Sequence, residues 1–582
     1  MKKTKVLAVL SAFFLLTACG EHTHTFSDTW KADEEQHWHE ATCEHKSIKA
    51  KTGAHTFGTA EVIDGEKKVT CTTCGYVKDF NPNDVEHSDG FSDVTEFDDA
   101  IEIHTDRQKT FLAYTGDYSK MPQADYPNGD ATISDPIRHT ISWDFEDHND
   151  VSKYSITIGS KKDLSDGFEI MGTTERSISA YNFFLGTNYY RINAYMGEDK
   201  VGSDVYKVEV DSTVPRNLYV GERMTNCRDV GGKELTSGGK IKQGLLYRTC
   251  GSGYDYGSKM TAEGEEILTK QLKVKTEINL NDSGSYNANL EGVKIYDTFM
   301  DYNAQQANTS RHHFARNTEN VRNVFDILSR KESYPTFFHC RIGTDRTGLI
   351  AILVNGVLGV PLNNIYQDYL FSNFGKIGTK RNIGTNDDDD ITKYMSEIMS
   401  MPGESFQEQV YNTLLTIGVT PEIIQSVKDI LIEGEQPDNN NGQVVVNAKD
   451  MTLSGTTLVT EDKTSLVART SPASYAVMSA NATATCNFTT SSGEKTIYGY
   501  LGHYENSTSK KVEDSIQVTL DGNTVTIPSI NFNTAGVGHC GNNRTNYYFV
   551  KLGTVNITSA GEHSIVVKGL TNDMHLANIA VF

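Results

Sequence analysis

The segment from Tyr334 to Gly348, YPTFFHCRIGTDRTG, constrains the fold of this chain more than any other. Residues 335–338 are apolar and predict a short buried strand. A loop follows that opens with Cys340 and contains Gly343, and a buried helix is predicted to begin near Arg346 and to run through residues 349–353. Backbone N–H groups of such a loop converge at a helix N-terminus, where an anion is favoured. The segment therefore predicts an anion-binding loop in an α/β layer domain.

The residues of this loop suggest a nucleophile and a positively charged group that binds phosphate. A thiol at a helix N-terminus beside arginine loses its proton near or below neutral pH, so we expect Cys340 to be a thiolate. Arg346 lies six residues later and can present its planar fork to two phosphate oxygens. Thr347 can donate to the sulfur, although a helix cap fits the same position. The remaining loop residues are predicted to bind substrate: Arg341, Ile342, Gly343, Thr344 and Asp345. The competing interpretation, a buried structural cysteine, does not account for His339 and Gly348 in this context.

His339-Cys340, five residues, Arg346 and Thr347 together resemble the signature of the cysteine-dependent protein-tyrosine phosphatase superfamily. The stretch 226–232, NCRDVGG, is similar to the opening motif of bacterial tyrosine and phosphoinositide phosphatases, and residues 368–373, DYLFSN, resemble a helix of that subfamily. The resemblance covers residues 213–434. It implies phosphomonoester hydrolysis through a phosphocysteine, with no cofactor for catalysis. It also places Arg228 and Asp229 in the substrate-binding group, as braces of the loop.

Two departures from the family pattern affect the expected site. Thr344 stands where relatives often have lysine, which makes multiply phosphorylated lipids less favoured substrates, and residues 279–281, NLN, replace an Asp-Leu-Arg strand end. A general acid must reach the ester oxygen. Asp301 is the first candidate and Asp297 and Asp345 are alternatives, while a solvated loop carboxylate is an equal interpretation of Asp301 and Asp297.

Two further cysteines fall in segments that pack near the loop in the resembling subfamily. Either Cys227 or Cys250 could form a reversible disulfide with Cys340, but buried free thiols are the expected state.

Length and charge limit the remaining possibilities. A chain of 582 residues is too long for one ordinary core, so several domains are expected. The 54 basic side chains are outnumbered by 76 acidic ones, for a formal charge of −22. This balance argues against nucleic acid as a partner.

The first residues indicate export. Lys2, Lys3 and Lys5 precede the apolar run 6–16, and the stretch 16–19, LTAC, follows. This pattern predicts a signal peptide over residues 1–18 and resembles a bacterial lipobox. We expect lipid on Cys19 and an extracytoplasmic position at the bacterial cell membrane. A plain secretory signal is the alternative.

Residues 19–80 concentrate histidine and cysteine in a segment with little to bury. The knuckle Cys71-Thr72-Thr73-Cys74 is half of a zinc site, which Cys43 and His45 are predicted to complete, with His55 or His39 as alternatives to His45. A structural zinc would supply the missing stability. A histidine-rich spacer or a Cys71–Cys74 disulfide are the competing interpretations.

The rest of the chain reads as linkers and β domains. Residues 81–98 and 435–443 are predicted linkers. Residues 99–212 alternate with period two and resemble a fibronectin type III β-sandwich with Trp143 in its core. Residues 444–582 include a predicted Asp521-Gly522 hairpin and resemble the galactose-binding-type jelly roll of carbohydrate-binding modules. The expected fold is thus multidomain, an α/β cysteine-phosphatase domain flanked by all-β sandwich domains.

Two surface features of these regions have open interpretations. Sugar contacts and core packing are equal interpretations of a set of residues near the C-terminus: Tyr498, Tyr500, His503, Tyr504, Asn542, Tyr547 and Tyr548. The four consecutive aspartates at 387–390 predict a solvated loop in preference to a calcium site.

Two functions are compatible with these patterns. The first is a membrane-anchored extracytoplasmic phosphatase that acts on a phosphorylated protein, of the phosphotyrosine type, or on a small phosphoester. The second is a surface adhesion or glycan-binding lipoprotein whose phosphatase fold is inactive or only binds phosphate. Cys340 and Arg346, both present, favour the enzyme.

Overall fold

The computed structural model describes most of the chain after the first 22 residues. The described residues are 23–57, 61–63, 66–79, 86–88, 90–122, 135–252, 260–281, 286–300, 317–378, 380–383, 390–438, 442–460, 474–504, 510–532, 538–540, 545–572 and 574–582. They divide into two compact units. The first holds the described residues up to 90 together with Asn149–Ser152 and Asn193–Asp204, and the second holds the rest.

The first unit is built from two small antiparallel sheets. One has the order β1-β2-β3 and the other β4-β5-β6. Their strands are β1 (Phe26–Ala32), β2 (Gln36–Ala41), β3 (Lys49–Ala54), β4 (Glu61–Ile63), β5 (Glu66–Thr70) and β6 (Val77–Asp79). Further along, β7 (Glu86–His87) runs parallel to β15 (Asp199–Gly202). Residues 23–79 bury few apolar side chains, because Ala41, Val69 and Cys71 are the buried ones among those described.

The second unit begins with an all-β region. A sheet with strands in the order β12-β11-β14, with β16 also paired to β14, accompanies the pairs β8 with β10 and β9 with β13. The strands are β8 (Phe91–Ser92), β9 (His139–Ser142), β10 (Asp144–Phe145), β11 (Lys153–Gly159), β12 (Phe168–Met171), β13 (Ser177–Ala180), β14 (Gly186–Met196) and β16 (Tyr206–Val210). Trp143 is buried and packs edge-on against Tyr154, as expected for a core residue.

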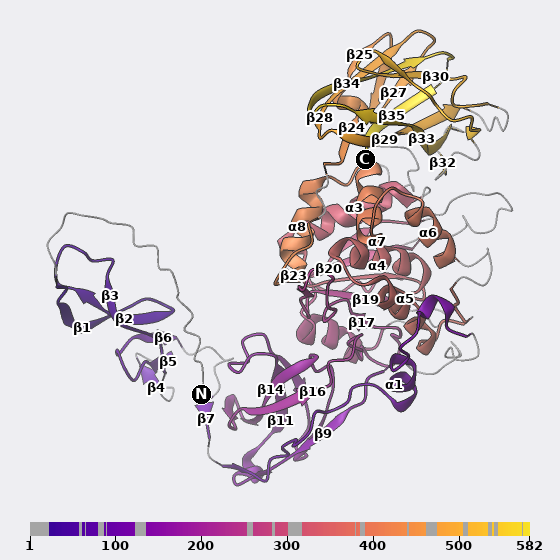
Figure 1. The fold of residues 1–582 in the computed structure, drawn as a ribbon. Coiled ribbons are helices and arrows are strands. Elements are labelled where there is room, and N and C mark those ends of the chain that lie inside the picture. Colours follow the sequence, from indigo (N-terminus) through magenta and orange to yellow (C-terminus); the bar gives the residue numbers. More distant parts are fainter. Residues whose placement is uncertain are drawn as a thin grey trace, which may run out of the picture. The chain divides into compact units, whose positions relative to one another are not determined.

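The α/β region is organised around a five-stranded sheet (Figure 1). Its order is β17-β19-β22-β20-β21, in which β19, β22, β20 and β21 are parallel and β17 is antiparallel to β19. The strands are β17 (Arg228–Asp229), β19 (Leu246–Cys250), β20 (Thr276–Asn279), β21 (Lys294–Asp297) and β22 (Thr336–Cys340). A separate pair joins β18 (Lys240–Ile241) to β23 (Ile432–Glu433). The parallel strands end at one edge, where ligands bind in open α/β sheets.

Helices surround this sheet, and one of them is entirely buried. They are α2 (Ala262–Glu266), which continues as a π-helical turn (Ile267–Gln271), α3 (Thr318–Leu328), α4 (Asp345–Leu358), α5 (Leu362–Phe371), α6 (Asp390–Met399), α7 (Phe406–Thr416) and α8 (Pro421–Leu431). All residues of α4 are buried, since it packs against β22 and against α5, α6 and α7. Gly359 ends α4 in the left-handed conformation.

One helix lies outside the range expected for the α/β region. α1 (Asp106–Leu112) and the 3-10 turn Tyr118–Lys120 fall within residues 99–212, which the sequence predicts as a β-sandwich. Their apolar residues join the core of the α/β region, where Phe111 packs against Phe371 and Phe374. Periodicity did not indicate this, because the contact is made with residues far along the chain.

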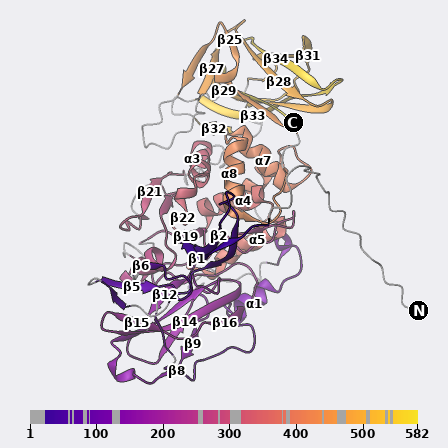
Figure 2. The same cartoon turned by 90° about the vertical axis from the view of Figure 1, so that its left-hand side faces the viewer.

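The C-terminal region consists of two sheets (Figure 2). One has the order β26-β27-β35-β29-β33-β32, with β24 also paired to β35, and the other β25-β28-β34-β30-β31. The strands are β24 (Val444–Asn447), β25 (Thr452–Ser454), β26 (Thr457–Thr460), β27 (Ser474–Met478), β28 (Thr483–Thr490), β29 (Gly493–Tyr504), β30 (Ile516–Leu520), β31 (Asn523–Val525), β32 (Gly538–Cys540), β33 (Thr545–Ile557), β34 (Gly561–Gly569) and β35 (Met574–Val581). The predicted hairpin is confirmed, because Leu520 pairs with Asn523 across Asp521 and Gly522.

Among the helices of the described residues, none is both long enough and apolar enough to cross a bilayer.

Candidate active site

The predicted anion-binding loop lies where the sequence places it, between the end of β22 at Cys340 and the start of α4 at Asp345. Donors outside the loop hold its carbonyl oxygens. Gly251 N–H donates to Arg341 O at 3.1 Å, and Asn226 Nδ2 donates to Ile342 O and Gly343 O at 3.2 and 3.0 Å. In a trans peptide the C=O and the next N–H point in opposite directions. The outward carbonyls therefore turn the N–H groups of residues 342–344 toward the inside of the loop, as an anion requires.

Gly343 is required by the shape of the loop. Its φ is 73°, in the left-handed region, and a Cβ at this position would lie 2.5 Å from the carbonyl oxygen of Thr249. A side chain here would push the loop away from β19.

Arg346 is held at the edge of the site by residues that follow two neighbouring strands, β20 and β21. Its Nη2 donates to Asn281 Oδ1 at 3.1 Å and its Nη1 lies 3.4 Å from Met300 O. Asn281 is itself fixed, because its backbone N–H donates to Asn279 Oδ1 at 2.9 Å. The strand end that departs from the family pattern therefore orients the arginine, a role that the sequence did not reveal.

The environment of Cys340 favours a thiolate. Burial raises the pKa of the thiol, but the positive charge of Arg346 and the hydroxyl and N–H of Thr347 outweigh it, so the pKa is lowered overall. The Thr347 hydroxyl makes no other hydrogen bond within the described residues and can donate to the sulfur. His339 fixes the strand end before Cys340, since its Nε2 bonds the buried Glu277 at 2.8 Å. Cys340 is 2 % exposed, so the sulfur lies deep in the fold.

A buried carboxylate supports the loop from beneath. Asp368 on α5 receives Arg228 Nε at 3.0 Å, Arg248 Nη1 at 2.5 Å and the more distant Lys233 Nζ at 3.7 Å. Burial raises the pKa of Asp368, but these three cations hold it far below its usual range. Arg248 also donates to Gly343 O at 2.9 Å, which links the cluster directly to the loop.

Arg228 and Asp229, predicted in the substrate-binding group, lie in this supporting layer. Both are fully buried. Arg228 is engaged by Asp368, Ser372 and Asn226, and Asp229 accepts from Arg216 Nη1 at 2.9 Å and from the N–H groups of Gly231 and Gly244 at 2.7 Å. Their polar atoms thus brace the protein rather than face a ligand.

The general-acid candidates differ in what surrounds them. Asp301 lies outside the described residues. Asp345 is buried, and Arg381 bonds both of its oxygens, at 2.8 and 2.9 Å. Asp297 is exposed at the end of β21, where Asn279 and Asn287 donate to it. Of the described candidates, Asp297 is at the same edge of the sheet as Cys340 and keeps access to solvent.

The neighbouring cysteines are free thiols. Cys250 pairs with Cys340 in the register of β19 and β22, and burial raises its pKa to about 12. Burial likewise raises the pKa of Cys227. Both thiols are therefore protonated at neutral pH, as expected for buried structural cysteines.

The predicted metal ligands are not brought together as expected. The structure divides them between two groups, His37, His55, Cys71 and Cys74 in one and His24, Cys43 and His45 in the other. Cys43 and His45 thus do not complete the Cys71–Cys74 knuckle, because the hairpin of β2 and β3 presents His37 there instead.

Three other predictions concern the lipidation residue, the run of aspartates and the candidate sugar contacts. The lipidation residue Cys19, the aspartates 387–389 and Asn542 lie outside the described residues, as do the side chains of Tyr504, Tyr547 and Tyr548. Tyr500 and His503 are buried, and Tyr498 stacks on Phe549. Tyr500 and His503 are therefore core, which removes them from the candidate sugar contacts, whereas Tyr498 is partly exposed.

Several supporting residues carried no sequence signal for their role. Asn226, Arg248 and Asp368 fall in stretches that resemble the family, but the resemblance did not show how they meet. Lys233, Glu277 and Arg381 had no recognisable pattern. Each acts through a partner at least 36 positions away in sequence.

Part of the chain is similar to the tyrosine phosphatase family. Residues 220–416 match the sequence model of that family. This range includes β17, Cys340, Arg346 and Asp368, which form the loop and its support. None of the curated proteins compared with the chain matches it.

Part of the chain is also similar to several solved structures. A Podospora anserina GH26-CBM35 β-(1,4)-mannanase is 17% identical, with 24% of this chain and 28% of that chain covered and a TM-score of 0.18. The C-terminal CBM6 of LamC from Zobellia galactanivorans is 14% identical over 24% and 98%, and CBM6cm-2 from Cellvibrio mixtus lichenase 5A is 17% identical over 24% and 95%, both with TM-scores of 0.17. The chain spans less than a third of the mannanase.

Replacing Asp368 with asparagine keeps the shape but leaves Arg228, Arg248 and Lys233 buried without their counter-charge. We expect Asp368→Asn to lower the free energy of unfolding by about 3–5 kcal/mol, measured by urea denaturation. Asp326→Asn is the matched control, because Asp326 on α3 forms a partly exposed ion pair with Arg330, just after that helix, and the substitution should cost less than about 1 kcal/mol. Equal effects of the two substitutions would contradict the assigned role of Asp368.

Removing the Thr347 hydroxyl should change the titration of Cys340. Since this hydroxyl favours the thiolate, Thr347→Ala is expected to raise the pKa of Cys340. The rate of iodoacetamide labelling, followed against pH, should then rise at a higher pH than in the wild type, with the two rates converging at alkaline pH. Thr413→Ala on α7, whose hydroxyl bonds Gln409 O, is the control. An unchanged profile for Thr347→Ala would show that the hydroxyl does not act on the sulfur.

Proposed function

We propose that this protein hydrolyses phosphomonoesters through a phosphocysteine intermediate on Cys340. One observation carries the proposal: the loop between β22 and α4 combines a sulfur of lowered pKa, inward N–H groups and Arg346 at its rim. A phosphate dianion matches this arrangement, because backbone N–H donors at a helix N-terminus and a guanidinium fork both bind phosphate oxygens. The match of residues 220–416 to the tyrosine phosphatase family supports the same reaction class.

The proposed reaction has two steps. In the first, the Cys340 sulfur attacks phosphorus, the S–P bond forms and the ester P–O bond breaks, while an acid protonates the leaving oxygen. Asp301 remains the first candidate for that acid, and Asp297 is the alternative. In the second step water attacks phosphorus and gives a proton to the carboxylate that the acid left, while the S–P bond breaks to release inorganic phosphate and restore the Cys340 thiolate. Arg346 and the loop N–H groups stabilise the charge of both transition states, and Thr347 stabilises the departing sulfur. No cofactor is assigned to catalysis.

The depth of the sulfur suggests the substrate class. Cys340 is 2 % exposed and Arg346 is 6 % exposed, so an ester must extend its phosphate well below the surface. A tyrosyl side chain holds its phosphate farther from the peptide backbone than a seryl side chain does. We therefore assign phosphotyrosine-type aryl esters, with Thr344 in place of lysine disfavouring multiply phosphorylated lipids.

Location and the flanking domains complete the proposal. The charged, apolar and LTAC stretches before residue 20 support lipid on Cys19 and an extracytoplasmic position. The alternating strands of residues 99–212 support a fibronectin type III-like domain. The two sheets of residues 444–582 support a jelly roll of the carbohydrate-binding-module type, with a cell-surface glycan as its candidate ligand.

Removing the sulfur nucleophile tests the reaction. Cys340→Ser should lower turnover of para-nitrophenyl phosphate and of a phosphotyrosine peptide by at least about a thousandfold, since serine lacks the activated thiolate. Cys486→Ala is the control, because Cys486 is also buried but lies in β28. The wild type should prefer a phosphotyrosine peptide over a phosphoserine peptide of the same sequence.

Three results would contradict this proposal. Turnover retained by Cys340→Ser would place the nucleophile elsewhere. A wild-type protein that binds inorganic phosphate without turnover would support the binding-only alternative. A preference for the phosphoserine peptide would overturn the assigned substrate class while leaving the reaction intact.

The lipid anchor has its own test. Cells expressing the full chain and fed radiolabelled palmitate should incorporate label into the wild type and not into Cys19→Ser, since the thioether requires that sulfur. Membrane fractionation should change in parallel. Unlabelled wild-type protein in the medium would favour the plain secretory signal.

A further inference from the structure

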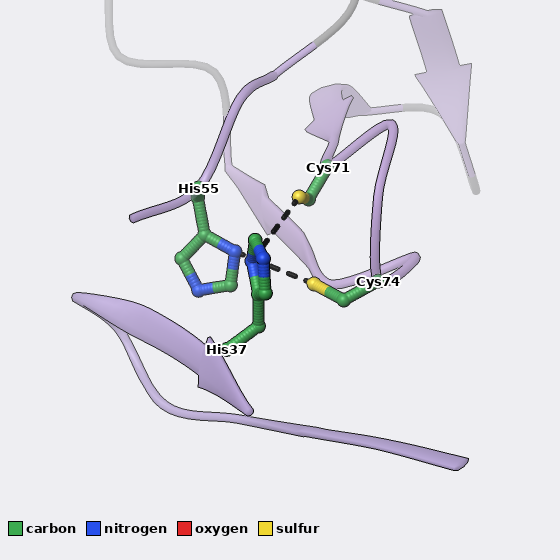
Figure 3. A group of neighbouring side chains, drawn as sticks. All are labelled: His37, His55, Cys71 and Cys74. Carbon is green, nitrogen blue, oxygen red and sulfur yellow. Dashed lines mark hydrogen bonds between the residues drawn. The ribbon is translucent and has the colours of Figure 1, made fainter. Parts of the chain in front are cut away.

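Four side chains from separate parts of the first unit converge on one point (Figure 3). His37 lies on β2, His55 follows β3, and Cys71 and Cys74 lie on the turn between β5 and β6. Their ligand atoms all lie within 4.8 Å of one another. The group therefore connects the β1-β2-β3 sheet to the β4-β5-β6 sheet.

The spacing of these atoms fits tetrahedral metal coordination. Zinc–sulfur and zinc–nitrogen bonds of about 2.3 and 2.0–2.1 Å put a sulfur and a nitrogen about 3.6 Å apart on a tetrahedron. Cys74 Sγ lies 3.4 Å from His55 Nδ1, and Cys71 Sγ lies 4.0 Å from His37 Nδ1. Both distances are within about 0.4 Å of the tetrahedral value.

Hydrogen bonds around the group already orient two of its parts. His55 Nε2 lies 2.8 Å from the carbonyl oxygen of Asp33, to which it can only donate. In a neutral imidazole the opposite nitrogen, Nδ1, then carries the lone pair, and Nδ1 faces Cys74. Metal-binding histidines are held by such a bond to a backbone carbonyl. The turn that carries Cys71 and Cys74 is also fixed by a hydrogen bond, because Gly75 N–H donates to Cys71 O at 2.9 Å and Gly75 has a φ of 74°.

The unit around the group has little else to hold it together. In residues 23–79 the buried apolar residues among those described are Ala41, Val69 and Cys71, while Val62 is 74 % exposed. His37 is buried, and its Nδ1 lies 4.0 Å from Cys71 Sγ. A segment of this size needs a metal or disulfides when it lacks a core.

We propose that His37, His55, Cys71 and Cys74 bind one structural Zn²⁺ that joins the two sheets of the first unit. Two thiolates and two imidazoles favour zinc by ligand type, and four protein ligands close the site, as in structural rather than catalytic zinc centres. This site is independent of the proposed phosphatase reaction. It contains Cys71, Cys74 and His55, which was an expected alternative to His45, and it differs from the set expected from the sequence by taking His37 in place of Cys43.

The second group supplies a matched comparison within the same unit. His24 Nδ1 lies 3.4 Å from Cys43 Sγ, which lies 3.9 Å from His45 Nδ1. His24 and His55 each open a His-Thr-Phe sequence. The second group offers three described ligands and its His45 is exposed. Cys43→Ser therefore removes a comparable thiol without touching the proposed site.

The full chain is purified under reducing conditions, exchanged with Zn²⁺ or Co²⁺ and freed of loosely bound metal. Zinc is counted by mass spectrometry of the element, and cobalt by its thiolate charge-transfer and visible ligand-field absorption. We expect a tightly held zinc in the wild type and in Cys43→Ser. We expect Cys71→Ser and Cys74→Ser each to lose one zinc equivalent relative to the wild type. Cys71→His should keep the metal but lose about half of the charge-transfer intensity, since one of the two sulfurs is gone.

Folding is measured separately, so that a variant that fails to fold is not mistaken for one that only loses zinc. A thiol-reactive mercurial added to the folded wild type should release the zinc and make residues 23–79 susceptible to trypsin. Phosphatase turnover by Cys340 is measured separately. A wild type that holds no zinc would overturn the proposal. Zinc retained by both Cys71→Ser and Cys74→Ser would also overturn it, as would a Cys71–Cys74 disulfide in the reduced preparation. The proposal would fail as well if Cys43→Ser lost the zinc equivalent that Cys71→Ser and Cys74→Ser lose.

Discussion

The ion cluster around Asp368 is the interaction on which the α/β region depends. One carboxylate, removed from water, faces Arg228, Arg248 and Lys233, and the pairs with the two arginines measure 3.0 and 2.5 Å. Buried ions cost several kcal/mol each to desolvate, so such a cluster persists only with good geometry. Here it connects β17, β19 and α5, which are distant in sequence. The same cluster reaches the loop through Arg248, so the scaffold and the site share one set of contacts.

The cluster also has more positive than negative charge. Burial lowers the pKa of Arg248 to about 10, as does the neighbouring Arg228, while Asp368 and the Cys340 sulfur act in the opposite direction. Burial likewise lowers the pKa of Lys233. An anion above this layer, whether the thiolate or a bound phosphate, relieves the excess of positive charge. The support beneath the loop therefore favours the charge state that the proposed reaction needs.

The local sequence pattern predicted those parts of the site that are contiguous in the sequence. The strand, the loop and the buried helix around Cys340 lie where the apolar runs and Gly343 predict them. These features follow from periodicity and turn chemistry, which operate over a few residues.

The parts that could not be predicted depend on packing between distant segments. Asn281 orients Arg346 across 65 positions, and α1 joins a core made mainly by residues beyond 230. The metal ligands were predicted only in part for a related reason, since Cys71, Cys74 and the alternative His55 meet but Cys43 and His45 do not join them. Histidines are frequent in residues 19–80, so spacing alone could not choose His37 over His45, whereas the strand pairing of β2 with β3 places His37 on the inward face.

The central claim, that the Cys340 sulfur carries the phosphoryl group during turnover, can be tested directly by rapid acid quenching with a ³²P-labelled aryl phosphate. We expect label on the peptide that contains Cys340, formed before inorganic phosphate is released and absent when free phosphate replaces the ester. Steady turnover with no label on that peptide, or with label on another residue, would contradict it.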